Sequence, residues 1–470
     1  MRCSVVIPCH NGADLTRHCV QSLLAQEGAT PAEILLVDNA SSDDIGSLAR
    51  LHPSVRVLRQ ASNLGFGAGT NAGIRASRGE LVLLLNNDTR AATNLLLELT
   101  RVLDSSPAIG AVAPVSNHVK GPARLPVGAI GRNAADRAAI AAALRPSTAA
   151  VQDVDSLAGL CLLLRRPTLD RVGWFDERFG HGNFEDDDLC LRLRLHGYRL
   201  VIARRAFLHH EGHATFRALG LDLPTEIQRR RRQFLDKWRP DPAGRATIAA
   251  MHADLRGAAT AAAAAQRIWP QWPDADWHLA RWHASNDDHA AAARHLRNLL
   301  RSCPQHSDAA LALGRALRSL GDDDAAGAHL LQTARTFHLD AMQLARVLGE
   351  LGQLDLRRNR PASATAHFLA AAALQPADGS LHNWAGVCQL AGGDLEAAER
   401  SFRAAAAADF ALAHTNLGIC LHRLGRGDEA RRSFERAVAL LPDDATARQN
   451  LLAAAGAGAG ATAPVSSRGS

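Results

Sequence analysis

A chain of 470 residues is too long for a single ordinary hydrophobic core, so the sequence predicts more than one folding unit. Hydrophobic residues make up 47% of the chain and charged residues 21%, which is a globular composition. The formal charge of +6 suits an anionic small molecule, an acidic glycolipid or a membrane surface as partner, and it is too small to indicate a nucleic-acid-binding protein.

Short apolar segments alternate with helical patterns from residue 1 to about residue 115. The apolar segments contain no internal alternation with polar residues, which favours strands buried on both faces of a largely parallel sheet. We therefore predict an α/β domain. Its predicted elements are strands at Cys3–Ile7, Ile34–Val37, Val55–Leu58 and Leu81–Leu85, and helices at Ala13–Gln26 and Gly67–Ala76.

Polar residues follow three of these strands, at Pro8–Asn11, Asp38–Ser42 and Asn86–Asp88. Ligands of open α/β sheets bind beyond the carboxyl ends of the strands. The three segments are therefore candidate binding positions.

The rest of this domain is less regular. Residues 116–150 lack a strand pattern and predict a mobile loop or a short helix. We expect the domain to span residues 1–240, followed by a linker at 241–273. Its later predicted elements are an ordered segment at Leu157–Leu164, an acidic segment at Asn183–Leu189 leading into a helix to about His196, and a strand at Leu200–Ala203.

From residue 274 to residue 455 the sequence repeats itself with a period typical of tetratricopeptide helix pairs. Ala280 and Gly314 are 34 positions apart (314 minus 280), and Gly386 and Gly418 are 32 apart (418 minus 386). Small residues let two helices cross closely while a bulky residue fills the gap, which predicts an all-α solenoid of about five helix pairs. The bulky residues follow sixteen positions after the small ones (296 minus 280), at Leu296, Leu330, Phe402 and Phe434.

Two parts of the C-terminal half depart from this period. One helix pair, Met342–Pro376, is expected to contain an expanded loop at Leu354–Asn359, and residues 456–470 are of low complexity and predicted to be disordered. A generic alanine-rich bundle is the alternative to a repeat array, but the agreement in register between the units favours repeats.

The eight cysteines are scattered without a Cys-x-x-Cys pair or a compact metal-ligand spacing. We therefore expect buried free thiols rather than a zinc site or a disulfide framework. The apolar segment at Cys3 leaves no room for a signal peptide, and the longest apolar runs have the length of strands. These features predict a cytoplasmic protein, with the inner face of the membrane as the second option.

Six motifs, in order along residues 1–239, resemble the inverting family 2 glycosyltransferases of GT-A fold. The resemblance implies transfer of a hexose or deoxyhexose from a nucleotide-diphosphate donor, a UDP-sugar or a dTDP-sugar. The motifs lie at Cys3–Gly12, Ile34–Asp43, Asn63–Gly73, Leu84–Thr89, Gly173–Glu177 and Phe184–Leu189.

The resemblance also implies a donor site. Asp38 matches the carboxylate that recognises the nucleobase, although a turn or helix cap before Ser41 is the alternative. A glycine-rich helix entry begins at Asn63, where free backbone N–H groups face phosphate. The residues expected to contact the nucleotide sugar are Pro8, Asn11, Asp38, Asn63, Gly65, Asn71 and Asn87.

Asn86-Asn87-Asp88 occupies the position of the family's Asp-x-Asp motif. By resemblance Asp88 binds a divalent cation, Mg²⁺ or Mn²⁺, that bridges the diphosphate; its alternative is a strand-end turn. Asn86 in place of the first aspartate leaves the affinity and identity of the metal open. His209 matches the family's late histidine, a metal or diphosphate contact, and motif alignment favours it over His210.

Four adjacent carboxylates, Glu185 to Asp188, begin a predicted helix and should raise one another's pKa. By resemblance Asp186 is the general base and Glu185 orients it. A favourable helix N-terminus explains Asp187 and Asp188 without any catalytic role.

The repeat array predicts a protein partner or protein acceptor, and we expect it to be dispensable for turnover of the donor. A glycan acceptor is the alternative, because the family's usual products are lipopolysaccharide and other cell-surface glycans. The basic segment Arg229–Arg232 is either a solvated face or a contact for an anionic acceptor or a membrane. Two other functions are possible alternatives. One is an interaction scaffold whose transferase half is inactive. The other is a sugar nucleotidyltransferase, which is disfavoured because Val5–Asn11 does not resemble the triphosphate-binding loop of those enzymes.

Overall fold

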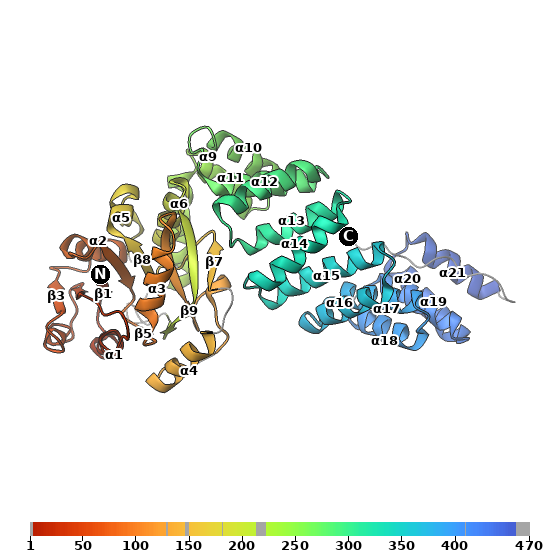
Figure 1. Cartoon of the computed structure of the whole chain (residues 1–470), viewed down its shortest axis with the longest axis horizontal. Coiled ribbons are helices and arrows are strands. Elements are labelled where there is room, and N and C mark those ends of the chain that lie inside the picture. The colour runs from red at the N-terminus through yellow and green to blue at the C-terminus, as the bar shows by residue number, and fades with distance from the viewer. Residues whose placement is uncertain are drawn as a thin grey trace. The chain divides into compact units, whose positions relative to one another are not determined.

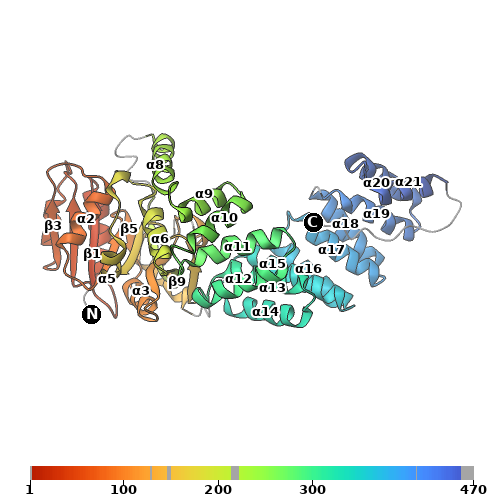
Figure 2. The same ribbon diagram turned by 90° about the horizontal axis from the view of Figure 1, so that it is seen from above.

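The computed structural model describes residues 3–127, 130–145, 150–180, 182–212, 222–408 and 410–456 (Figures 1 and 2). The chain divides into two compact units. Unit 1 contains Met1–Ala309 and Thr336–His338, and unit 2 contains Ala310–Arg335 and Leu339–Ser470. The predicted disordered tail lies outside the described residues, except for Gly456 at the end of the last helix.

Unit 1 is built on one sheet, for which the strand order in the described residues is β3-β2-β1-β4-β8-β6-β9-β5, with β7 beside β9. The strands are β1 (Cys3–Cys9), β2 (Glu33–Asp38), β3 (Val55–Arg59), β4 (Leu81–Leu85), β5 (Thr89–Ala91), β6 (Ile109–Ser116), β7 (Val151–Val154), β8 (Cys161–Arg165) and β9 (Arg199–His210).

The first half of the sheet is parallel, as predicted, and the second half is mixed. Strand β1 pairs in parallel with β2 and β4, and β2 pairs in parallel with β3. Strand β8 is antiparallel to both β4 and β6, whereas β9 is parallel to β6 and antiparallel to β5 and β7. The sheet is therefore less parallel than the strand pattern of the first 115 residues indicates.

The later strands differ in extent from the predicted segments. The ordered segment predicted at Leu157–Leu164 begins as a loop, and β8 starts at Cys161. Strand β9 continues well beyond the predicted Leu200–Ala203 and ends at His210. The two adjacent histidines therefore lie in a strand, where successive side chains point to opposite faces.

Helices cover both faces of the sheet, because the strands carry apolar side chains on both faces. On one face, α1 (Ala13–Leu24) and α3 (Leu95–Asp104) pack against Val5 and Ile7. On the other face, α2 (Phe66–Ala76), α5 (Arg166–Val172) and α6 (Glu185–Leu195) pack against Val6 and Val82. Within the predicted loop 116–150, α4 (Ala134–Leu144) adds Ala141 to this second cluster.

Residues 241–273 are mostly helical rather than a linker. They contain α9 (Pro242–Met251) and α10 (Leu255–Ala265), which follow α8 (Leu223–Trp238). Their alanines pack in one cluster with Leu191 and Leu195 of α6, with Phe234 of α8 and with Trp272. Their small alanine side chains let these helices approach one another closely.

The remaining described helices form the repeats (Figure 2). A Cβ added to Gly386 would lie 2.6 Å from the Phe402 ring, and one added to Gly418 would lie 2.4 Å from the Phe434 ring, which confirms the small and bulky pairing. The helices are α11 (Pro273–Ser285), α12 (His289–Ser302), α13 (Ser307–Ser319), α14 (Asp323–Thr336), α15 (Ala341–Arg357), α16 (Pro361–Leu374), α17 (Gly379–Ala391), α18 (Leu395–Ala407), α19 (Leu412–Arg423), α20 (Gly427–Leu440) and α21 (Ala445–Gly456).

The predicted expanded loop at Leu354–Asn359 is wrong, because α15 continues to Arg357. The Asp355 side chain is buried there and accepts hydrogen bonds from Ser363 and His367. The eight cysteines are buried and free, as expected. Among the described helices, none has the length and apolar character needed to cross a membrane.

Candidate active site

Asp38 is the last residue of β2 and is buried at the edge of the sheet. Its Oδ1 accepts the backbone N–H of Ser41 at 2.9 Å, and its Oδ2 pairs with Arg59 Nη1 at 2.5 Å. Burial alone would raise the pKa of Asp38, but the hydrogen bonds from Ser41 and Arg59 lower it below its usual value. Asp38 is therefore an ionised acceptor held in a turn.

Asn11 and Asn87 connect the ends of β1 and β4 at the same edge. Asn11 has a left-handed backbone (φ 60°), and its Oδ1 accepts hydrogen bonds from the Ser42 backbone and hydroxyl groups. Asn87 Nδ2 lies 3.4 Å from the Asn11 carbonyl and donates to Thr16 Oγ1 at 3.0 Å. The polar segments that follow β1, β2 and β4 are thus neighbours.

The glycine-rich helix entry mainly has a structural role. Asn63 Oδ1 accepts the Gly65 N–H at 2.9 Å, and Gly65 has a φ of 83°. Asn71 Nδ2 donates to the Phe175 carbonyl, and Asn71 Oδ1 accepts the Phe175 N–H. The amide of Asn71 therefore joins α2 to the segment around Phe175, and the structure does not bring it to the other candidate residues.

Asp88 follows β4 and is buried next to His210, not His209. His210 Nε2 lies 3.3 Å from Asp88 Oδ1, and His210 Nδ1 lies 2.8 Å from the His118 carbonyl. Burial lowers the pKa of His210, but the hydrogen bond to Asp88 and its negative charge outweigh this effect and raise the pKa above its usual value.

The choice of His209 is therefore not supported by the geometry. His209 is buried on the opposite face of β9, where its Nε2 lies 3.5 Å from Glu211 Oε1. Burial lowers its pKa. Motif alignment does not separate two adjacent histidines, whereas strand alternation does.

The groups around Asp88 fit a hard cation that takes further ligands from outside the protein. Asn86 Oδ1 is buried and has no hydrogen-bond partner among the described residues. Asp88 supplies a carboxylate and His210 an imidazole nitrogen close to it. No cluster of three or more histidine, cysteine or acidic ligands occurs in the described ranges, so the protein alone would not complete a coordination shell.

Asp186 is held at the start of α6. Its Oδ2 accepts the Gly159 N–H at 2.7 Å, and its Oδ1 accepts the Asp187 N–H at 3.0 Å. Burial and the nearby charge of Asp187 raise its pKa to about 6, although these two N–H groups act in the opposite direction. A carboxyl group that titrates near neutral pH is suited to general base catalysis.

The other three acidic residues have different environments. Glu185 is buried. Its burial and, to a lesser extent, the charge of Asp186 raise its pKa well above the usual value. Asp187 Oδ1 accepts the Ser156 hydroxyl at 3.0 Å. Asp188 is fully buried and pairs with Lys237 and Arg192 while accepting the Trp238 Nε1–H, so it attaches α8 to α6. This is a structural role, as expected for Asp188.

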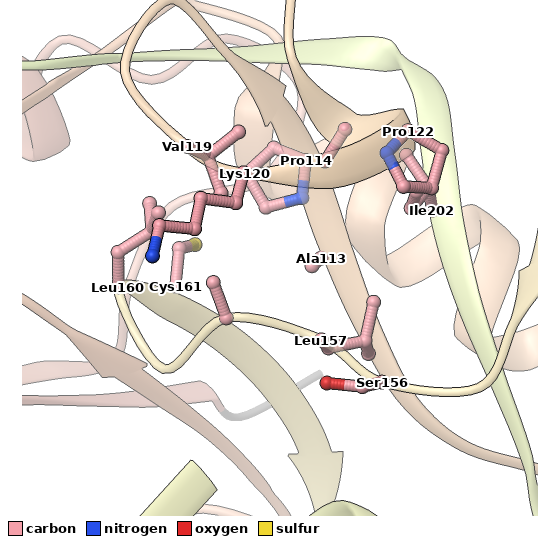
Figure 3. Close-up of a pocket in the computed structure, with 12 residues that line it drawn as sticks. Ala113, Pro114, Val119, Lys120, Pro122, Ser156, Leu157, Leu160, Cys161 and Ile202 are labelled. Carbon is pink, nitrogen blue, oxygen red and sulfur yellow. The ribbon is translucent and has the colours of Figure 1, made fainter. Parts of the chain in front are cut away.

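One loop, Ser156–Leu160, connects the two ends of the site. The Asn86 N–H donates to the Leu160 carbonyl at 3.0 Å, and the neighbouring Gly159 N–H donates to Asp186. The same loop lines a small pocket with Lys120, whose positive charge acts on Asp187 (Figure 3). Asn86, two residues before Asp88, and Asp186 therefore contact the same loop, although they are far apart in sequence.

Sequence reasoning missed Gly159, Ser156 and His210. A Cβ on Gly159 would lie 3.1 Å from Asp186 Cβ, a tight contact that a side chain at this position would make only if the neighbouring atoms shifted slightly. The sequence signal for Gly159 is a glycine near the beginning of the apolar run Leu157–Leu164.

Three family models match the chain. "Glycosyl transferase family 2" matches residues 4–135, and "Glycosyl transferase family group 2" matches residues 81–253. "Tetratricopeptide repeat" matches residues 279–337, 350–409 and 391–445.

Curated relatives are similar to the N-terminal half. An N-acetylglucosaminyl-diphospho-decaprenol L-rhamnosyltransferase of Mycobacterium tuberculosis is 31% identical over 240 residues, covering 44% of this chain and 75% of that protein. The uncharacterized protein y4gI of Sinorhizobium fredii is 28% identical over 225 residues, and the chain spans 24% of its length. The O-antigen biosynthesis protein RfbC of Myxococcus xanthus is 30% identical over 230 residues, which are 44% of this chain and 17% of RfbC.

Solved structures share similarity with each half. GalNAc-T7, crystallised with UDP, GalNAc and Mn²⁺, is 17% identical with a TM-score of 0.37, covering 44% of this chain and 43% of that one. PilF of Pseudomonas aeruginosa is 18% identical with a TM-score of 0.40, covering 47% of this chain and 98% of that one.

Proposed function

We propose that this chain, which belongs to glycosyltransferase family 2 and carries C-terminal tetratricopeptide repeats, moves a sugar from a nucleotide-diphosphate donor to an acceptor hydroxyl with inversion. The observation that carries the proposal is that the loop Ser156–Leu160 contacts both Asp186 and Asn86, the residue two positions before Asp88. A leaving-group site and a base therefore share one edge of the sheet.

Asp186 is the proposed general base. With a pKa of about 6, it is mostly ionised at neutral pH and still basic enough to take the acceptor proton. The N–H groups of Gly159 and Asp187 hold the two carboxylate oxygens and fix their direction. Burial and the charge of Asp186 raise the pKa of Glu185 well above its usual value, which disfavours a second charge beside the base.

Asp38, Asn11 and Asn87 are the proposed donor contacts. Asp38 is ionised and buried beside the exposed Arg59, a combination suited to the N–H donors of a nucleobase. Pro8 is buried near the end of β1, and Asn63 and Gly65 shape the adjacent helix entry. Asn71 is removed from this set, since its amide is occupied by Phe175.

Asp88 and His210 are the proposed ligands of a divalent cation, Mg²⁺ or Mn²⁺, with Asn86 Oδ1 as a further oxygen nearby. When bound, such a cation neutralises charge on the diphosphate of the departing nucleotide. The protein's own contribution is to keep an ionised oxygen ligand buried at the end of β4.

The acceptor is proposed to be a glycan carried on a lipid diphosphate, or a protein bound by the repeats. The named activity of the mycobacterial relative and the role of RfbC in O-antigen biosynthesis support the lipid-linked glycan. Exposed Arg229 and Arg232 on α8 would then face an anionic lipid surface. The repeats support the protein acceptor.

A donor screen tests this function. The full chain is incubated with a panel of UDP-sugars and dTDP-sugars, with Mn²⁺ or with a chelator, and release of the nucleotide diphosphate is measured. We expect release with one donor class, metal dependence, and an inverted anomeric proton signal in the product. Absence of release from every donor, under conditions where the chain is folded, would favour an inactive scaffold instead.

A further inference from the structure

The helix that begins with Glu185 and Asp186 is fixed at its other end by a buried arginine. Arg194, in the last turn of α6, is 1% exposed. Its guanidinium pairs with Asp274 in the first turn of α11, lies 3.6 Å from Asp155, and donates to Cys303 Sγ at 3.3 Å. A buried guanidinium requires such partners, so α6 is tied to the first repeat helices and to Asp155.

Asp155 directly precedes the loop that holds the catalytic carboxylate, and a histidine from the repeats binds it. His306 Nε2 lies 3.3 Å from Asp155 Oδ1. His306 Nδ1 accepts the Ala309 N–H at 3.2 Å, so the neutral ring carries its proton on Nε2 and donates it to Asp155. The histidine is buried, with its ring 5.4 Å from that of Trp277.

A second attachment lies two residues earlier in the same segment. The Asp153 N–H donates to the Gln305 carbonyl at 3.0 Å, and the Gln305 N–H donates to Asp153 Oδ2 at 2.6 Å. Asp153 also pairs with Arg199 of β9. The connection between α12 and α13 therefore lies along β7, just before the chain enters the loop Ser156–Leu160.

We propose that Arg194, Asp155 and His306 are positioning residues that hold the loop Ser156–Leu160 where the Gly159 N–H meets Asp186. The inference rests on the proposed function, because it assigns these residues to the same base. It also makes the helix pair α11 and α12 part of the catalytic unit. The initial expectation that residues from about 275 onward are dispensable for donor turnover is thereby replaced.

The Asp155 side chain is 53% exposed, which makes a purely stabilising role a poor explanation for these contacts. Ion pairs with an exposed partner contribute little to global stability. Small displacements of a catalytic group, in contrast, reduce turnover strongly. Loss of the His306 contact should therefore affect catalysis more than folding.

The test compares variants of the full chain. His306→Ala removes the contact, His306→Gln keeps an acceptor for Ala309 and a donor for Asp155, and His295→Ala is the matched control. His295 lies in α12, the helix before His306, and makes a similar contact, 2.7 Å from Asp276, with no hydrogen bond to the loop among the described residues. Donor kcat, donor KM, the pH profile and thermal unfolding are measured for each.

For His306→Ala we expect kcat to fall about tenfold with KM within about twofold of the unaltered chain. The acidic midpoint of the kcat profile should move to higher pH, because Asp186 loses the N–H that stabilises its ionised form. His306→Gln should recover most of the activity, and His295→Ala should be unaffected. Equal behaviour of His306→Ala and His295→Ala would overturn the proposal, as would loss of stability with an unchanged pH midpoint.

A spectroscopic readout separates this inference from the function on which it rests. The Gly159 amide, labelled with an isotope and assigned from the spectrum of Gly159→Ala, should titrate with Asp186 and change its midpoint in His306→Ala. If the unaltered chain turns over no donor, the proposed function fails, and the amide still shows whether His306 holds the loop. An unchanged Gly159 titration in His306→Ala would contradict the positioning role in either case.

Discussion

Asp186 combines burial, which disfavours its charge, with two N–H groups that orient it. Its neighbours differ from it because their partners differ. Asp188 has three cationic or N–H partners and attaches two helices, while Glu185 has a buried oxygen without a hydrogen-bond partner in the described residues. Four adjacent acidic residues thus perform separate tasks, and only the local contacts distinguish them.

The pH profile of turnover should report Asp186. Because the base must be ionised and burial raises its pKa to about 6, kcat should fall as the pH decreases through that value. Turnover is measured at saturating donor and acceptor from about pH 5 to about pH 8. A rate that stays constant across the acidic half of this range would contradict the assignment of the base.

Gly159→Ala should impair catalysis without unfolding the domain. The added Cβ would lie 3.1 Å from Asp186 Cβ, so either the loop or the carboxylate must shift. We expect kcat to fall about tenfold, measured by donor turnover. Gly427→Ala is the control, because nothing lies within 4 Å of a Cβ at that position. Equal kcat for the two variants would show that the close approach at Gly159 is unimportant.

Asp88→Ala should abolish the metal dependence of donor binding, since the carboxylate is the one ionised oxygen ligand in the proposed site. Calorimetric titration of the donor with and without Mn²⁺ measures the effect. His210→Gln should weaken Mn²⁺-dependent binding, whereas His52→Gln, an exposed control, should not. Donor binding that keeps its full response to Mn²⁺ in Asp88→Ala would argue against this metal site.

At the scale of elements, α6 is the part that the site depends on most. Its N-terminus carries the base, Asp188 fixes α8 to its first turn, and its last turns pack against α8 to α11. Asp188→Asn should therefore lower the free energy of unfolding by about 3 kcal/mol, because two partly buried cations lose a fully buried countercharge. Chemical denaturation measures this. Asp236→Asn on the exposed side of α8 is the control, and an equal effect of both would contradict the buried role of Asp188.

The sequence predicts the first half of the sheet well and the second half poorly. Strands β1, β2 and β4 are continuous apolar runs that end in polar residues, so their position and ligand-facing ends are readable. The extent of β9 and the position of the loop before β8 cannot be predicted in this way. The local sequence does not show that Gly159 lies in a loop, or which of two adjacent histidines faces the site. His210 and Gly159 become recognisable only once the pairing of β5 with β9 and the position of α6 are known.

At the scale of the whole molecule, the start of the sequence repeats does not coincide with the boundary between the two compact units. The repeat period identifies helix pairs from residue 274 onward, whereas unit 1 includes the chain up to Ala309. Periodicity reports how a helix pairs with its neighbour, and it carries no information on which pair also packs against the sheet. The contacts of Arg194 and His306 show how α11 and α12 group with the helix that carries the proposed catalytic residues.

The central claim is that Asp186 acts on a donor whose diphosphate is held elsewhere, at Asp88. The most direct test measures donor affinity and transfer rate on the same Asp186→Asn preparation in the presence of Mn²⁺. We predict unchanged donor affinity and a transfer rate reduced about a thousandfold, within the range of a lost general base. An Asp186→Asn variant that transfers at the original rate, or that no longer binds the donor, would contradict the account.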